Sequence, residues 1–161
     1  MLIAKVADHQ TARIVAAAAT SVKNGMNILT RTRDARKMYR GDAEKKWTDD
    51  TSVQSVDLQK AIMLLPMPRM KTAAFTKRII AFHETFALMG SAKKNESTRK
   101  NISVVWHEAI AGRKAEEIVA TFVKALKYER DCKSITYWLD SCASQNKNWC
   151  LFTVLASLVN S

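Results

Sequence analysis

The chain lacks the features of membrane-spanning and secreted proteins. Its longest apolar run, Cys150 to Val159, is about half of the ~20 residues that a membrane span needs. Met1 to Lys5 do not form a basic segment ahead of a sustained apolar stretch, so no secretory signal is evident. The three cysteines, Cys132, Cys142 and Cys150, cannot all pair within one chain, and their spacing fits no zinc finger. We therefore expect an intracellular protein, without a membrane partner, whose thiols serve as small apolar side chains.

Several enzyme motifs are also missing from the sequence. It has no Gly-rich phosphate loop, no H-E-x-x-H and no G-x-S-x-G. A nucleophile built from Cys142 with His83 or His107 is conceivable, but nothing in the spacing selects it. We expect these two histidines and His9 to be structural or solvated side chains.

The composition is that of a globular chain with a strong positive charge. A length of 161 residues makes one domain, or one domain with an arm, the default. Apolar residues at 47% and charged residues at 25% exclude a disordered or fibrous chain. The formal net charge of +11 favours a polyanionic partner, most often nucleic acid or an anionic membrane.

Residues 1–51 predict a helical, basic N-terminal arm, because they contain no proline and many helix formers. Ala12 to Val22 is one predicted helix, and Lys23-Asn24-Gly25 supplies its C-terminal stop. The second, about Arg31 to Trp47, has many basic and few acidic residues. A helical face of one charge raises affinity for nucleic acid regardless of sequence. We therefore expect phosphate contacts from this helix; a solvated face is the alternative. The candidate residues are Arg36, Lys37 and Arg40.

From residue 52 the pattern changes to short extended segments and then to apolar helices. The first extended segment ends ahead of Pro66 and Pro68, which are poor residues for the middle of a sheet. The predicted elements are the strands Ser55–Leu64, Phe75–Phe86 and Asn101–Glu108, the helix Ala115–Arg130, the strand Ser134–Leu139 and the helix Trp149–Val159.

This order of elements indicates an α/β fold with a mixed sheet. Three strands with short connections form an antiparallel meander, and the following helix places the fourth strand parallel to one strand already in the sheet, which is the first strand in the fold proposed next. Such a sheet with helices on its faces is the layout of the ribonuclease-H-like fold, although other small α/β folds share parts of it. We predict this core over residues 52–161.

Two aspartates are the main candidates for chemistry. Asp57 lies in the first predicted strand and Asp140 ends the fourth, so adjacent parallel strands bring both to one edge of the sheet. Paired carboxylates favour a hard cation, Mg²⁺ or Mn²⁺, and two such ions support phosphoryl transfer. A further catalytic carboxylate is expected from Glu116 or Glu117 at the start of the next helix, or from nearby Glu108, and spacing does not separate the three. Equally, these aspartates suit edge or turn positions, and the helical glutamates suit a helix N-terminus.

The polar segment after Asp140 is a second candidate for phosphate contacts. Small and amide side chains between a strand and a helix suit contact with phosphates at the helix start. An ordinary strand-to-helix turn with a polar N-cap is the alternative. The candidate nucleic-acid-binding residues are Gln145, Asn146, Lys147 and Asn148.

Four ordered blocks of the sequence resemble one protein family. They are Ser55-Val-Asp-Leu-Gln-Lys60, Lys71-Thr-Ala-Ala-Phe-Thr-Lys-Arg78 with Ala81-Phe-His-Glu-Thr-Phe86, Val105-Trp-His-Glu-Ala-Ile-Ala-Gly-Arg113 and Trp138-Leu-Asp-Ser-Cys-Ala-Ser-Gln-Asn-Lys-Asn-Trp149. The blocks resemble invertebrate transposon-derived proteins that carry a D-N-C-x-G-Q-N-K-N signature. The resemblance implies a ribonuclease-H-like transposase or integrase core that is metal-dependent. It also implies that Asp57 and Asp140 are its first two acidic ligands, that Glu117, or Glu116, is a third one on the helix, and that the protein works in the nucleus.

The chain departs from the family pattern at several points. Ser141 and Ser144 stand where the signature has Asn and Gly, and the sequence stops ahead of the family's later acidic residue. We therefore expect a C-terminally truncated, degenerate domain that binds DNA with little or no catalysis. The last helix is expected to leave an apolar face open to self-association. Metal-dependent DNA cleavage or strand transfer, and a protein-interaction module, are the alternatives.

Overall fold

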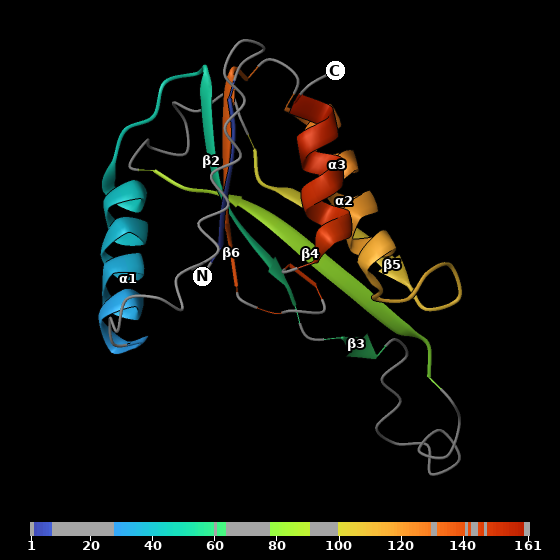
Figure 1. The fold of residues 1–161 in the computed structure, drawn as a ribbon. Helices are drawn as coiled ribbons and strands as arrows, with labels where there is room; N and C mark the ends of the chain where they lie inside the picture. The colour runs from blue at the N-terminus through green and yellow to red at the C-terminus, as the bar shows by residue number, and fades with distance from the viewer. Residues whose placement is uncertain are drawn as a thin grey trace.

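The computed structural model describes residues 2–7, 28–59, 61–63, 78–90, 100–129, 132–140, 142, 145–146 and 148–159. In this part of the chain, six strands form one mixed sheet with three helices on its faces. α1 (Ile28–Glu44) covers one face, while α2 (Ala115–Tyr128) and α3 (Trp149–Val159) lie together on the other (Figure 1). The predicted α/β class with a mixed sheet is confirmed.

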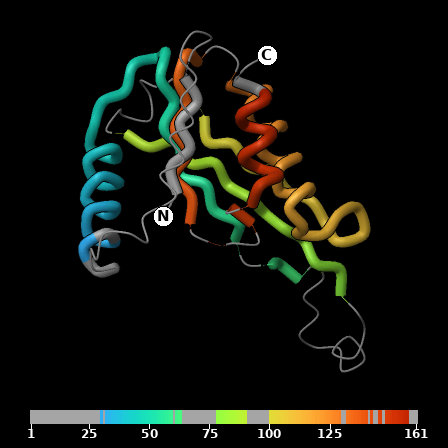
Figure 2. Tube along the Cα trace, viewed as in Figure 1, coloured from blue at the N-terminus to red at the C-terminus, as the bar shows by residue number. Residues whose placement is uncertain are grey.

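The pairing of the strands confirms the predicted meander and return strand. β2 (Thr51–Leu58) pairs antiparallel with β4 (Ile80–Leu88), and β4 pairs antiparallel with β5 (Ile102–His107). α2 then leads to β6 (Ser134–Leu139), which pairs parallel with β2. Figure 2 follows this path from α1 on one side, through the sheet, to α2 and α3 on the other.

The first described residues form a strand, and the prediction of a wholly helical segment over residues 1–51 is wrong there. β1 (Leu2–Ala7) pairs antiparallel with β6, with Leu2 opposite Leu139 and Ala7 opposite Ser134. So short a strand depends on backbone pairing with a partner far along the chain. Its own sequence is therefore a weak predictor of strand structure. The helix predicted over Ala12–Val22 lies outside the described residues, as does its predicted stop.

The other predicted elements are present with shifted ends. The second predicted helix is α1, which ends at Glu44. The first predicted strand is β2, and its remaining part forms a separate short strand, β3 (Ile62–Met63), which pairs with the start of β4. The second extended run is described only from residue 78 onward and forms β4. β5, α2, β6 and α3 occupy the predicted positions.

The core lies between the sheet and the pair α2 and α3. Phe86, Phe122 and Tyr137 meet edge to face, with ring centroids 5.1–6.1 Å apart. Leu151 and Leu155 of α3 are buried in the same cluster. The core therefore covers Leu151 and Leu155 of the last helix, while self-association of the chain stays a prediction. Within the described part of the chain, no helix has the length and hydropathy to cross a membrane.

Candidate functional site

α1 is held to the sheet by contacts with one buried indole. Nε1 of Trp138, a β6 residue that is 2% exposed, donates a hydrogen bond to the Asp42 carboxylate at 3.0 Å. The Tyr39 ring meets the same indole edge-on at 5.5 Å. Beyond the helix, Nε1 of Trp47 donates to the Asp42 carbonyl at 3.0 Å. Gly90, with φ of 135°, lets the Trp47 ring pass close to the chain after β4. These contacts fix which side of α1 faces the sheet.

The opposite side of α1 is cationic and exposed. The side chains of Arg33, Arg36, Lys37 and Arg40, here called the cationic face, are spaced to share one side of the helix and are all solvent-exposed. No ion pair joins them to another residue that the structure describes. The exposed acidic residues of the helix are Asp34 and Glu44. Three of the predicted phosphate contacts, Arg36, Lys37 and Arg40, therefore lie together on this face.

Asp57 and Asp140 lie at the same end of two adjacent strands. Val56 is opposite Leu139 in the parallel pair of β2 and β6, so each aspartate is the next residue of its chain segment. Both side chains are exposed. Oδ1 of Asp140 accepts hydrogen bonds from the Cys142 backbone N–H at 3.1 Å and from Nδ2 of Asn146 at 2.5 Å. Asp140 therefore stabilises the start of the loop to α3.

Glu117, the third predicted carboxylate, belongs to the α2 side of the sheet. Val56 is buried in the core beneath α2 and α3, and side chains alternate along a strand, so Asp57 faces the opposite side. Glu117 is half-buried near the start of α2, beside Gly112. The structure thus brings the two aspartates to one edge and does not place Glu117 with Asp57.

A larger cluster of metal-ligating side chains is not found among the described residues. Within the described ranges, no three His, Cys, Asp or Glu side chains are grouped so as to hold a metal ion. The alternative Glu116 is exposed on α2, and Glu108 accepts a hydrogen bond from the Ile80 backbone N–H at 3.3 Å. Among the described residues, no further carboxylate joins Asp57 and Asp140, and binding of Mg²⁺ or Mn²⁺ by these two side chains stays a prediction.

The amide side chains ahead of α3 organise the loop and the helix start. Oδ1 of Asn148 accepts from the Leu151 backbone N–H at 2.8 Å, which is an N-cap contact. Nδ2 of Asn148 donates to the Gln145 carbonyl at 2.6 Å. Asn146 is buried and bonds to Asp140. The alternative interpretation, a turn with a polar N-cap, describes this loop well; its contact with phosphate stays a prediction. Lys147 lies outside the described residues.

The sequence analysis missed a buried carboxylate, Glu84 of β4, which is 1% exposed. The Thr121 hydroxyl of α2 donates a hydrogen bond to it. Burial raises the Glu84 pKa to about 7; the Thr121 hydrogen bond lowers it in part, and the negative charge of Asp57 raises it further. The sequence pattern could have predicted this burial. Phe82, Glu84 and Phe86 are alternate residues of one strand, and alternate residues lie on the same face, here the core face.

A second buried carboxylate lies at the opposite end of the sheet. Glu129, directly after α2, accepts hydrogen bonds from Nε2 of Gln54 and from Sγ of Cys132, each at 3.0 Å. Gln54 also bonds to Ser52 of the same strand. These contacts tie the end of α2 to β2, and Cys132 acts in them as a hydrogen-bond donor and not only as the small apolar side chain that was predicted.

Comparison with known proteins adds no assignment. No protein-family model, curated protein or solved structure matches the chain.

Proposed function

We propose that the chain is a ribonuclease-H-like domain, descended from a transposase or integrase core, that binds nucleic acid through the cationic face of α1 with little or no catalysis. The observation that carries the proposal is the anchoring of α1. Because Asp42 and Tyr39 bind Trp138, the cationic face is directed to solvent. Phosphate contacts supply nearly all non-specific affinity for nucleic acid, and a fixed cluster of cations suits them.

The strand order supports the ribonuclease-H-like part of the proposal. β5, β4 and β2 are antiparallel neighbours, β6 is parallel to β2, and α2 connects β5 to β6. Descent from a transposase rests on the four sequence blocks, and a nuclear location follows from that descent. The net charge of +11 favours an anionic partner in the same way.

A charge-reversal variant of α1 tests the proposal. We would measure fluorescence anisotropy of a labelled DNA duplex of about 20 base pairs at about 100 mM salt, a condition under which phosphate contacts still contribute strongly. The test variant is R36E/K37E/R40E. The matched control, K114E/K124E/K127E, makes the same charge change at exposed residues at or in α2, on the other face of the sheet.

We expect the α1 variant to bind DNA about tenfold more weakly, or worse, while the control stays within about threefold of the wild type. Equal losses in both variants would assign binding to overall charge and not to α1. No DNA affinity in the folded wild type would favour a protein-interaction module instead.

Metal-dependent DNA cleavage is the second candidate, favoured only by the shared edge position of Asp57 and Asp140. Calorimetric titration with Mn²⁺ separates it from the first. The variants D57N and D140N are suited to this test, because Asn at position 140 keeps an oxygen that accepts from Cys142 and Asn146. Saturable binding that both variants lose would support cleavage. The account proposed here predicts no saturable binding by the folded chain.

A further inference from the structure

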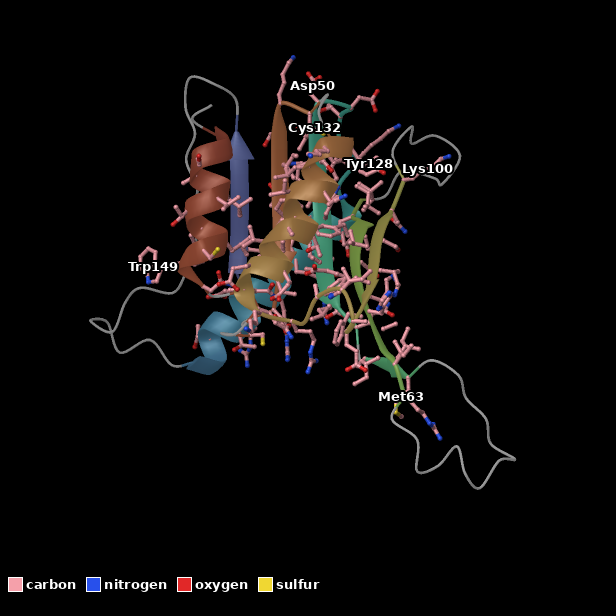
Figure 3. The ribbon with its side chains drawn as sticks, turned by 90° about the vertical axis from the view of Figure 1, so that its right-hand side faces the viewer. Asp50, Met63, Lys100, Tyr128, Cys132 and Trp149 are labelled. Atoms are coloured by element: carbon pink, nitrogen blue, oxygen red, sulfur yellow. The ribbon has the colours of Figure 1, made fainter. Side chains whose placement is uncertain are left out.

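Trp149 is the most exposed large hydrophobic side chain among the described residues. It is the first residue of α3, and 85% of it is accessible to solvent. Figure 3 shows the indole projecting away from the start of the helix, on the side of the molecule where β1 lies. Trp is usually largely buried, and so exposed an indole suggests a binding role.

The indole is carried by a well-fixed backbone. Asn148 caps α3 through Leu151 and bonds to the Gln145 carbonyl, so the first turn of the helix is held on both sides of Trp149. Phe152, one turn along, meets the indole at 77° with ring centroids 6.4 Å apart. No other described ring contacts Trp149, and none stacks face to face on it. The ring is therefore positioned but not covered by a parallel partner.

The residues ahead of Trp149 are polar, and, among the described residues, Phe152 is the one large apolar side chain shown in contact with the indole. The residues ahead of it include the amides Gln145, Asn146 and Asn148, all half-buried or buried. The other exposed large hydrophobic side chains lie on other elements; the labelled Tyr128 and Met63 are well separated from Trp149 in Figure 3. A protein partner needs a contiguous apolar area, whereas a single exposed ring suits the flat face of a nucleobase.

We propose that Trp149 is a stacking site for an unpaired base of single-stranded nucleic acid. This inference rests on the proposed nucleic-acid function and narrows its ligand. Bases in a duplex have both faces stacked on neighbours, so an indole can stack only on a base that is unpaired or displaced. The cationic face contacts phosphates of either form, while Trp149 adds affinity for single strands alone.

The experiment compares a labelled oligo(dT) of about 12 nucleotides with a duplex of about the same length, by fluorescence anisotropy. The test variants are W149A and W149F. The matched control is Y128A, because Tyr128 is also an exposed aromatic residue, 79% accessible, at the far end of α2. Circular dichroism checks that each variant is folded; substitutions at such exposed sites change stability little.

We expect W149A to weaken binding of oligo(dT) about 5- to 150-fold, W149F to lie between W149A and the wild type, and both to bind duplex as the wild type does. Y128A should match the wild type on both ligands. Oligo(dT) should also quench tryptophan emission in the wild type but much less in W149F.

The outcomes separate this inference from the function on which it rests. If the wild type binds neither ligand, the proposed nucleic-acid function fails. If it binds oligo(dT) and W149A binds equally well, the function stands and the stacking site is refuted. If W149A loses duplex and oligo(dT) affinity equally, Trp149 contacts the backbone or supports the fold, and base stacking is refuted.

Discussion

The burial of Glu84 predicts a stability that falls as pH rises. The carboxyl group lies beneath α2 with 1% of the residue exposed, and burial raises its pKa from 4.5 to about 7. The folded state therefore binds a proton that the unfolded state has released between these two pH values. The contribution of Glu84 to the free energy of unfolding should be largest below about pH 4.5 and decrease up to about pH 7.

The hydrogen-bonding of Thr121 agrees with a protonated Glu84. Its hydroxyl lies close to the Glu84 carboxyl group and 2.6 Å from the Ile118 carbonyl, and one hydroxyl hydrogen cannot serve both acceptors. The Thr121 hydroxyl donates to Glu84 when the carboxyl group is ionised; when Glu84 is protonated, the hydroxyl can donate to the Ile118 carbonyl while Glu84 donates to the hydroxyl oxygen. A Gln side chain at position 84 can donate in the same way at every pH.

The magnitude follows from the two pKa values. A change from 4.5 to about 7 corresponds to about 3 kcal/mol of unfolding free energy between acid and mildly basic pH. Urea denaturation of the wild type and E84Q, at several values from about pH 4 to 8, measures this difference directly. We expect E84Q to gain about 3 kcal/mol relative to the wild type over that range.

The control for this prediction is E116Q, which removes an exposed carboxylate from α2. Other titrating groups are shared by all three proteins and cancel in the comparison. E116Q should follow the wild type at every pH. A constant difference between E84Q and the wild type would refute the raised pKa of Glu84.

Three further variants test the fold around the site. Asp42→Ala leaves the buried Nε1 of Trp138 unpaired and should lower the unfolding free energy, measured by urea denaturation, by about 1–3 kcal/mol. It should also weaken duplex binding, because α1 is no longer fixed to the sheet. Unchanged stability would contradict the role of the Asp42–Trp138 hydrogen bond in holding α1. Asn148→Ala removes the N-cap of α3 and should lower the unfolding free energy by about 1 kcal/mol. Asn148→Asp keeps a capping oxygen and should retain most of that stability. Phe122→Ala opens a cavity beside Phe86 and should lower the unfolding free energy by about 3–5 kcal/mol; a loss below about 1 kcal/mol would contradict its place in the core.

The sequence predicted the elements whose patterns are local and strong. α2 has apolar residues at helical spacing, and β6 is a compact run of β-branched and aromatic residues, so both appear where expected. Connection rules predict that β6 returns parallel to a strand of the sheet, and the proposed fold makes that strand β2, which places Asp57 and Asp140 at one edge.

Features that depend on contacts between distant segments were not predictable in the same way. β1 is a strand because it pairs with the free edge of β6, and the residues of β1 alone do not predict that pairing. The direction of the cationic face is set by Asp42 and Trp138, which are far apart in sequence. Glu117 does not lie with Asp57, because side chains alternate along β2 and Asp57 is on the face away from α2. The spacing of these residues along the sequence does not show which face of the sheet each one occupies.

The central claim, that the cationic face of α1 binds nucleic-acid phosphates, is tested most directly by the salt dependence of duplex binding. We would plot the logarithm of the binding constant against the logarithm of salt concentration for the wild type, R36E/K37E/R40E and K114E/K124E/K127E. If the three α1 cations each contact a phosphate, reversing them should make the slope shallower by about 2.7, while the control keeps the wild-type slope. Equal slopes for the wild type and the α1 variant would contradict the claim.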